Sequence, residues 1–130
     1  MIQSPARMCL RRISIALLVA LVFFPAAALA HRRATKTERQ TILAAIVKQR
    51  QLTRSQAACQ VVTISTVNQS YASATWPAKL SKACQRVAAN GVIIEHRTKG
   101  HWRFVTVGSS FQCPVKGLPT RVARDLGICS

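Results

Sequence analysis

The sequence predicts an α+β fold: one N-terminal helix packed on a four-stranded antiparallel meander, a short C-terminal helix and two disulfides. Three observations lead to this prediction. Apolar residues repeat at helical spacing before residue 50, β-branched runs follow from Val61, and four cysteines lie behind an export-type leader. The chain divides into a leader over residues 1–30, a mobile basic lead-in over 31–34 and a single disulfide-stapled domain over 35–130.

The leader has the three parts of a secretory signal peptide. Arg11 and Arg12 belong to a basic start, Ile13–Phe24 is a nearly unbroken apolar run, and Ala28-Leu29-Ala30 offers a signal peptidase site. We expect cleavage after that site, so the mature protein begins at His31 and is exported to the outside of the cell or its envelope. An uncleaved anchor is the alternative, because the run extended through residue 30 has 18 residues, near the lower limit for a spanning helix.

The first helix is predicted from about Lys36 to Gln51. Thr35 and Glu38 have the spacing of a capping box at its start. Its apolar stripe consists of Ile42, Leu43, Ile46 and Val47. The basic residues that point elsewhere are Arg39, Lys48 and Arg50. They form either a binding face or a solvated face.

Two strands follow the helix. Val61–Val67 is β-branched except at Ser65, Asn68–Ser70 is typical of a turn, and Tyr71–Trp76 returns as the second strand. Ala89-Asn90-Gly91 predicts the next turn.

The third and fourth strands, Val92–Arg97 and His101–Val107, flank Thr98-Lys99-Gly100. A three-residue loop that ends in Gly suits a type I turn with a bulge. In that register Glu95 lies opposite Arg103. The resulting apolar face contains Val92, Ile94, Trp102 and Phe104.

A two-residue loop at Lys99-Gly100 would shift the pairing by one residue and mix Glu95 with Phe104 on one face. The cleaner separation of polar from apolar side chains favours the three-residue loop. It predicts that Trp102 is buried and Arg103 exposed.

A short C-terminal helix is predicted to start at Pro119. Leu118, Val122 and Leu126 fall on one face, and Gly127 is well placed to end it. The helix must pack close to the end of the sheet.

Four cysteines remain after the leader, an even number that indicates disulfides in an exported chain. We expect Cys59–Cys84 and Cys113–Cys129, because each pair brackets one compact unit. A zinc site of all four thiolates is the rival, but the chain has no C-x-x-C pair. The sequence therefore predicts neither a metal nor a cofactor.

The composition is strongly basic, with 19 Lys and Arg against 3 Asp and Glu. Without the three arginines of the leader, 16 basic residues face Glu38, Glu95 and Asp125, a net charge of +13. Such a surface attracts polyanions at long range, and outside a cell these include wall polymers, acidic lipid head groups and nucleic acid. The same charge also fits simple solubility in an arginine-rich coding background.

The order of one helix and a meander resembles the helix-plus-curved-sheet folds of the cystatin-like and nuclear-transport-factor-like families. The strand Gly100–Val105 is similar to the G-x-W-x-V/I strand of the second family, with Phe104 at the aliphatic position. The mature chain also resembles a group of small exported proteins of high-GC Gram-positive bacteria. The residues that carry this likeness are Asn90-Gly91-Val92, Gly100–Val105, Gly108-Ser109, Cys113-Pro114, Val122–Leu126 and Cys129. These resemblances imply a fold and no activity.

Few groups suit catalysis. Glu38 is expected to cap the first helix, Asp125 lies in the short C-terminal helix, and an arginine opposite Glu95 would lower the pKa of its carboxyl. His96, His101 and Glu95 are the remaining catalytic candidates, since a base, an acid and arginines are the tools of small secreted ribonucleases. Adjacent strand residues point to opposite faces, however, so Glu95 and His96 cannot converge on one substrate.

Two functions of different classes remain, and we favour the first. It is an exported, non-enzymatic binding or interaction module for an anionic cell-envelope component, although a protein partner also fits. The alternative is a small secreted hydrolase or nuclease that uses the His, Glu and Arg residues of the 92–107 hairpin. A pocket that holds two of the catalytic candidates would favour the enzyme. The expected binding residues are Arg97, Lys99, Arg103, Arg39, Lys48 and Arg50.

Overall fold

The computed structural model describes residues 31–130. The predicted signal peptide, its cleavage site and the alternative of an uncleaved anchor lie outside these residues. Within residues 31–130, no helix is both long and apolar enough to cross a membrane.

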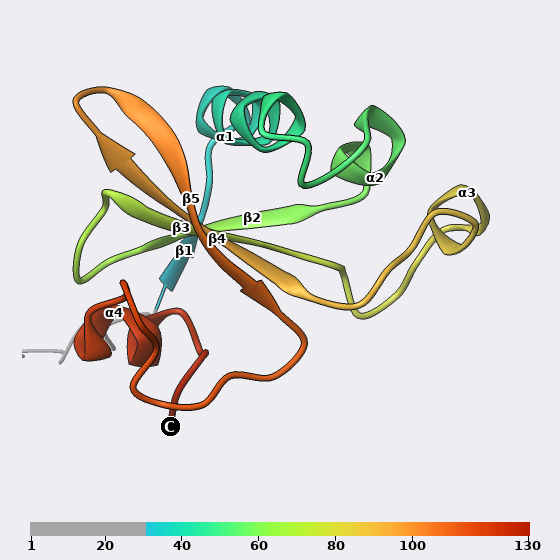
Figure 1. Cartoon of the computed structure of the whole chain (residues 1–130). Coiled ribbons are helices and arrows are strands. Elements are labelled where there is room, and N and C mark those ends of the chain that lie inside the picture. The colour runs from blue at the N-terminus through green and yellow to red at the C-terminus, as the bar shows by residue number, and fades with distance from the viewer. Residues whose placement is uncertain (1–30) are drawn as a thin grey trace, which may run out of the picture.

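A five-stranded antiparallel sheet forms the centre of the fold, and each strand pairs with its neighbours in sequence (Figure 1). The strands are β1 (His31–Arg33), β2 (Val61–Ser65), β3 (Tyr71–Thr75), β4 (Val92–Thr98) and β5 (His101–Gly108). The helices are α1 (Lys36–Lys48), α2 (Arg54–Ala58), α3 (Lys82–Gln85) and α4 (Thr120–Asp125). The α+β class and the meander order are confirmed, but the predicted sheet lacks one strand.

The additional strand is β1, which lies in the segment 31–34 that the sequence predicts as a mobile basic lead-in. Arg32 pairs with Ile64 of β2, and its guanidinium donates two hydrogen bonds of 2.8 Å to the Glu38 carboxylate. His31 Nδ1 lies 3.0 Å from the carbonyl oxygen of Asp125. These partners are distant in sequence or belong to the next helix, and three residues carry no strand pattern of their own.

The first helix begins as predicted and ends about one turn early. Thr35 and Glu38 form the capping box in both directions. The helix stops at Lys48 because Gln49 caps it and Arg50 takes a positive φ of 60°. Ile42, Leu43 and Ile46 are buried, whereas Val47 is only partly covered.

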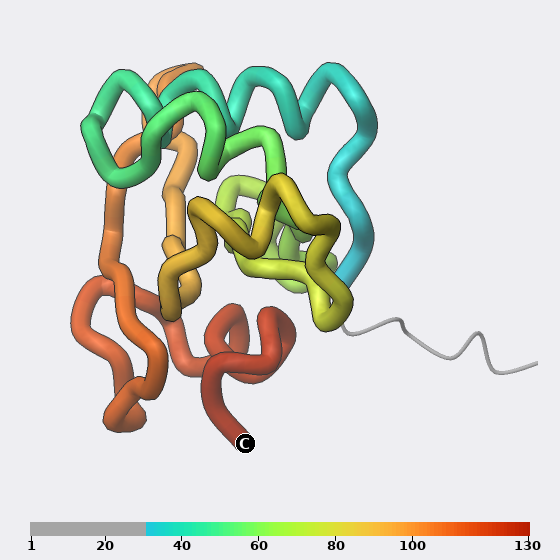
Figure 2. Tube along the Cα trace, turned by 90° about the vertical axis from the view of Figure 1, so that its right-hand side faces the viewer, coloured from blue at the N-terminus to red at the C-terminus, as the bar shows by residue number. Residues whose placement is uncertain are grey.

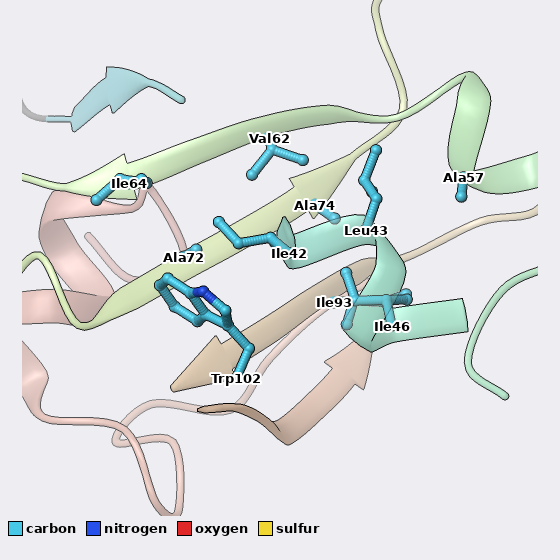
Figure 3. Close-up of a cluster of buried hydrophobic side chains, with 10 residues drawn as sticks. All are labelled: Ile42, Leu43, Ile46, Ala57, Val62, Ile64, Ala72, Ala74, Ile93 and Trp102. Carbon is cyan, nitrogen blue, oxygen red and sulfur yellow. The ribbon is translucent and has the colours of Figure 1, made fainter. Parts of the chain in front are cut away.

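These α1 side chains pack on one face of the sheet, against residues from four strands and from α2 (Figure 3). The sheet contributes Val62, Ile64, Ala72, Ala74, Ile93 and Trp102 to this cluster. Burial of such a contiguous apolar surface is the main favourable contribution to folding.

The C-terminal segment covers the opposite face of the sheet, so α1 and α4 lie on opposite sides of it (Figures 1 and 2). This second cluster contains Tyr71, Ile94, Leu118, Val122, Ala123 and Leu126. The three predicted stripe residues of the C-terminal helix are all buried there. The sequence predicts one apolar sheet face, and the fold has two.

The β4–β5 hairpin adopts the two-residue loop that the sequence analysis disfavours. Thr98 pairs with His101, and the loop residues Lys99 and Gly100 both have positive φ, 50° and 78°. Two successive residues with positive φ are what a type I′ turn requires, and the twist of that turn suits paired strands.

The shorter loop changes which side chains share a face. Glu95 lies opposite Phe104, so the predicted pairing of Glu95 with Arg103 is wrong. A bulge then leaves Val105 unpaired, because the next pair is Ile94 with Thr106. The predicted burial of Trp102 and exposure of Arg103 are confirmed. The prediction of the longer loop assumed that the hairpin has one polar and one apolar face. This assumption fails because both faces of the sheet are covered.

Both predicted disulfides are present. Cys59–Cys84 joins the end of α2 to α3, with Cα atoms 5.7 Å apart, and Cys113–Cys129 closes the C-terminal segment, with Cα atoms 6.1 Å apart. Two such bridges indicate an oxidising, extracytoplasmic environment. With all four thiols paired, the rival zinc site has no ligands.

A basic groove between α1 and β5

A groove of about 670 Å³ lies where the last turns of α1 pass the start of β5. We call it the basic groove. Its residues come from two segments that are distant in sequence: Thr41, Ala45, Lys48 and Gln49 on the helix side, and Gly100, His101, Trp102, Arg103 and Phe104 on the hairpin side.

The side chains of the groove combine charge with apolar surface. Lys48, His101 and Arg103 are exposed. Phe104 is 39% exposed, whereas Trp102 is buried at 8% and closes the floor toward the core. A basic rim over an aromatic floor suits an anionic ligand that also carries apolar groups.

Gln49 joins the C-terminal end of α1 to the β4–β5 hairpin beneath the groove through hydrogen bonds. Its side-chain Nε2 donates to the Trp102 carbonyl oxygen at 2.9 Å and to Glu95 Oε2 at 3.2 Å. Glu95 is completely buried, and neither its Oε1 nor Gln49 Oε1 has a hydrogen-bond partner.

Burial raises the pKa of Glu95 to about 7, and the hydrogen bond from Gln49 only partly offsets this rise. From the sequence we expect the opposite shift of this pKa, caused by an arginine opposite Glu95. That expectation is wrong because the register places Phe104 there instead.

The other two acids of residues 31–130 are occupied elsewhere. Hydrogen bonds from Arg32 and from the Thr35 backbone lower the pKa of Glu38 to about 2. Burial opposes ionisation of Asp125, yet hydrogen bonds from Ser65, Val67 and Thr66 outweigh it and lower its pKa. Asp125 thus ties α4 to the end of β2.

The basic residues therefore lack acidic counterparts. The ion pair between Arg32 and Glu38 is the only one among the described residues. No acidic residue lines the basic groove. The cations that line the groove, Lys48 and Arg103, therefore have no acidic side chain beside them in the lining.

The three catalytic candidates do not converge. Glu95 is buried on the α1 face of the sheet, while His96 stacks on Tyr71 on the other face, with ring centroids 4.1 Å apart. His101 alone lines the basic groove. No group of three or more His, Cys, Asp or Glu residues within 31–130 has the arrangement of a metal site.

Two of the six predicted binding residues, Lys48 and Arg103, meet in the basic groove. Arg39 instead donates to the carbonyl oxygens of Ala58 and Gln60 at 3.1 and 3.0 Å, and so holds α2 against α1. Arg97 lies over the Trp102 ring, 5.6 Å from its centroid.

The remaining two, Lys99 and Arg50, are exposed at chain reversals with positive φ and do not line the groove. Sequence reasoning missed Gln49 and the exposed position of Phe104. In the sequence Gln49 looks like an ordinary helix cap. Its bonds to Trp102 and Glu95 can be foreseen only when the register of the hairpin is known.

A second hollow of about 470 Å³ lies between α1 and α2. Leu43, Val47 and Ala57 are among its apolar lining, and Lys48 borders both this hollow and the basic groove. Arg39 also lines it but is already bound to backbone carbonyls, so Lys48 and the exposed Arg54 are its other cations, while Lys48, His101 and Arg103 line the basic groove.

Comparison of the chain with protein-family models, curated proteins and solved structures gives no match. The resemblances to cystatin-like and nuclear-transport-factor-like folds and to small exported proteins of high-GC Gram-positive bacteria therefore stay predictions.

Proposed function

We propose that the protein is an exported, non-enzymatic binding module that holds an anionic component of the cell envelope in the basic groove. The observation that carries the proposal is the uncompensated charge at this groove. Lys48, His101 and Arg103 border it, and no acid lies among its residues. Long-range attraction would guide a polyanion to the surface, and the groove would orient it.

The pairing of the acids supports the same function. Because Glu38 is bound to Arg32 and Asp125 to residues 65–67, the protein itself does not neutralise its other cations. Positive charges that serve only solubility can be spread over the whole surface and do not have to line a groove. The two disulfides add support for a location outside the cytoplasm, where envelope polyanions are found.

The alternative of a small hydrolase or nuclease has less support. None of the five main hollows among residues 31–130 is lined by two of the three catalytic candidates. Glu95, the acid with the most suitable pKa, is completely buried and cannot contact a substrate.

Binding to polyphosphate and to phosphatidylglycerol vesicles tests the proposal, with dextran and phosphatidylcholine vesicles as uncharged controls. We expect affinity for the anionic probes to fall about tenfold or more between about 50 and 200 mM salt, because binding releases counterions. An affinity that does not respond to salt would contradict the proposal.

A charge-matched pair of variants locates the binding site. Lys48→Gln with Arg103→Gln removes two charges from the basic groove, whereas Lys82→Gln with Arg86→Gln removes two exposed charges at α3. The groove variant should bind several-fold more weakly than the α3 variant. Equal losses would mean that the charge acts diffusely and that the groove is not the site.

A further inference from the structure

The basic groove follows an unpaired edge of the sheet. Among the described strands β5 pairs only with β4, so its other edge forms no ladder, although the Trp102 carbonyl on that edge accepts a hydrogen bond from Gln49 Nε2. The groove is lined by five consecutive residues, Gly100–Phe104. Consecutive strand residues point to opposite faces, so a groove lined by all of them must run along the edge rather than across one face.

We infer that this groove takes an extended, acidic segment of a partner protein, which pairs with β5 as a sixth strand. The inference rests on the proposed function, which requires a negatively charged partner. It adds that this partner is a protein segment in an extended conformation. A segment that adds to a sheet edge binds through backbone hydrogen bonds, while pockets beside the edge select alternate side chains. Pairing along His101–Phe104 spans about 13 Å.

The helix side of the groove supplies the second wall for such a segment. Thr41, Ala45 and Lys48 lie on three successive turns of α1 and face the hairpin across the groove. A paired strand would therefore present alternate side chains to α1, one of them within reach of the Lys48 ammonium. Gln49 keeps the two walls together through its bonds to Trp102 and Glu95.

Charge selects an acidic occupant and disfavours a second copy of the chain. Arg103 and His101 are exposed on β5, and Lys99 is exposed in the turn before it. Two β5 edges that paired with each other would bring like charges together, which destabilises strand pairing. Natural proteins use charged side chains on edge strands to prevent this kind of self-association. The same cations favour a partner segment that carries Asp or Glu.

The exposed apolar side chains on β5 favour a partner segment in which acidic and apolar residues alternate. Phe104 and Val107, at 39% and 48% exposed, are two of the three large hydrophobic residues exposed in the described part of the chain. Phe104 lines the groove itself. An added strand with acidic residues on one face and β-branched residues on the other would cover Phe104 and pair with the cations.

The probe is a capped peptide of alternating Glu and Val, about as long as a natural strand. Two N-methylated versions carry the methyl groups on every second residue, in the two opposite phases. Only alternate amides of an edge-bound strand face its partner. Calorimetric titration into the mature protein should show that one methylated version loses about tenfold or more in affinity, since several hydrogen bonds are lost, while the other stays near the unmodified peptide. Equal affinities for the two versions would overturn the inference.

A matched pair of apolar variants tests the position of the segment. Phe104→Ser removes exposed apolar surface from the groove, and Val67→Ser removes a similarly exposed side chain at the β2–β3 turn. We expect weaker peptide binding for Phe104→Ser only, with both variants keeping the wild-type far-ultraviolet circular dichroism spectrum. Equal effects of the two substitutions would contradict binding along β5.

The two proposals fail in different ways. If polyphosphate binds with salt dependence and the peptide does not, the proposed function stands and the strand pairing is wrong. If neither binds, both are wrong. If the protein sediments as a dimer and the peptide does not bind, a second copy occupies the edge and the inference is overturned.

Discussion

Glu95 is the residue whose chemistry depends most on its surroundings. Its carboxyl is buried under α1 beside Gln49, and the pKa of about 7 means that the folded protein holds this proton where an unfolded chain has lost it. A group whose pKa is higher in the folded state stabilises the fold below its unfolded pKa. That stability is lost as pH rises through the folded value.

The free energy of unfolding should therefore fall by about 2 kcal/mol between about pH 5 and pH 8 as Glu95 ionises. In Glu95→Gln, which cannot ionise, this part of the slope should disappear. Urea unfolding at several pH values measures it. An unchanged slope in the variant would show that the carboxyl is already ionised at pH 5.

Glu38→Gln is the control for that experiment. Because the pKa of Glu38 is lowered to about 2, its contribution is present at neutral pH and is lost only as pH falls through that acidic range. The substitution should lower the free energy of unfolding at every pH from 5 to 8 without changing the slope.

For single residues, the sequence predicts hydrogen-bond partners that are close along the chain and misses those that are far apart. The capping box of Thr35 and Glu38 was predictable because three residues separate them. The burial of Glu95 was not, because it depends on a contact with Gln49, which lies 46 residues earlier.

At the scale of elements, the β4–β5 turn decides the register and with it the basic groove. Lys99 holds a positive φ of 50°, a conformation that costs most side chains free energy and suits Asn. Lys99→Asn should raise the free energy of unfolding by about 0.5 kcal/mol, since Asn tolerates this region better. Lys79→Asn, at another exposed lysine, is the control and should change little.

The neighbouring residue gives the opposite prediction. Gly100 has a φ of 78°, and no heavy atom lies within 4 Å of the Cβ that a substitution would add there. Gly100→Ala should thus lower the free energy of unfolding by about 1 kcal/mol through backbone strain alone. Thermal unfolding of both turn variants measures the two shifts, and a stabilising alanine would mean that the turn is not of this type.

Elements with a strong local signal were predicted well. α1 and β2–β5 are present close to their expected bounds, because their hydrophobic periods are long enough to read. β1 and the short helices α2 and α3 have only three to five residues each. Such segments form because distant contacts hold them, as Arg32 holds β1 to α1.

For the whole molecule, the Cys59–Cys84 bridge is the covalent attachment of the segment between β3 and β4, beside a hydrogen bond from Gln56 Nε2 to the Val87 carbonyl oxygen. No residue of α3 is buried, and Cys84 is joined to the rest of the fold by this disulfide. Replacing both cysteines with serine should lower the free energy of unfolding by about 3 kcal/mol, the effect of releasing a loop of this length. Chemical denaturation measures the loss, and a change below about 0.5 kcal/mol would show that other contacts hold the segment.

The basic groove was only partly predictable for a reason that belongs to the whole molecule. Lys48 and Arg103 could be chosen from their charge, but their meeting needs α1 to cross the start of β5. The position of α1 over β5 depends on how both faces of the sheet are covered. No single segment of the sequence contains that information.

The order of the disulfides along the chain has a consequence for biogenesis. Each native bridge joins cysteines that are consecutive among the four of residues 31–130, 25 and 16 residues apart. Every other combination of these four residues would close a longer loop, at a higher cost in chain entropy. Loop-closure entropy therefore favours the native pairing in the unfolded chain. We therefore expect the reduced protein to regain its native disulfides with an oxidant alone, without a disulfide isomerase.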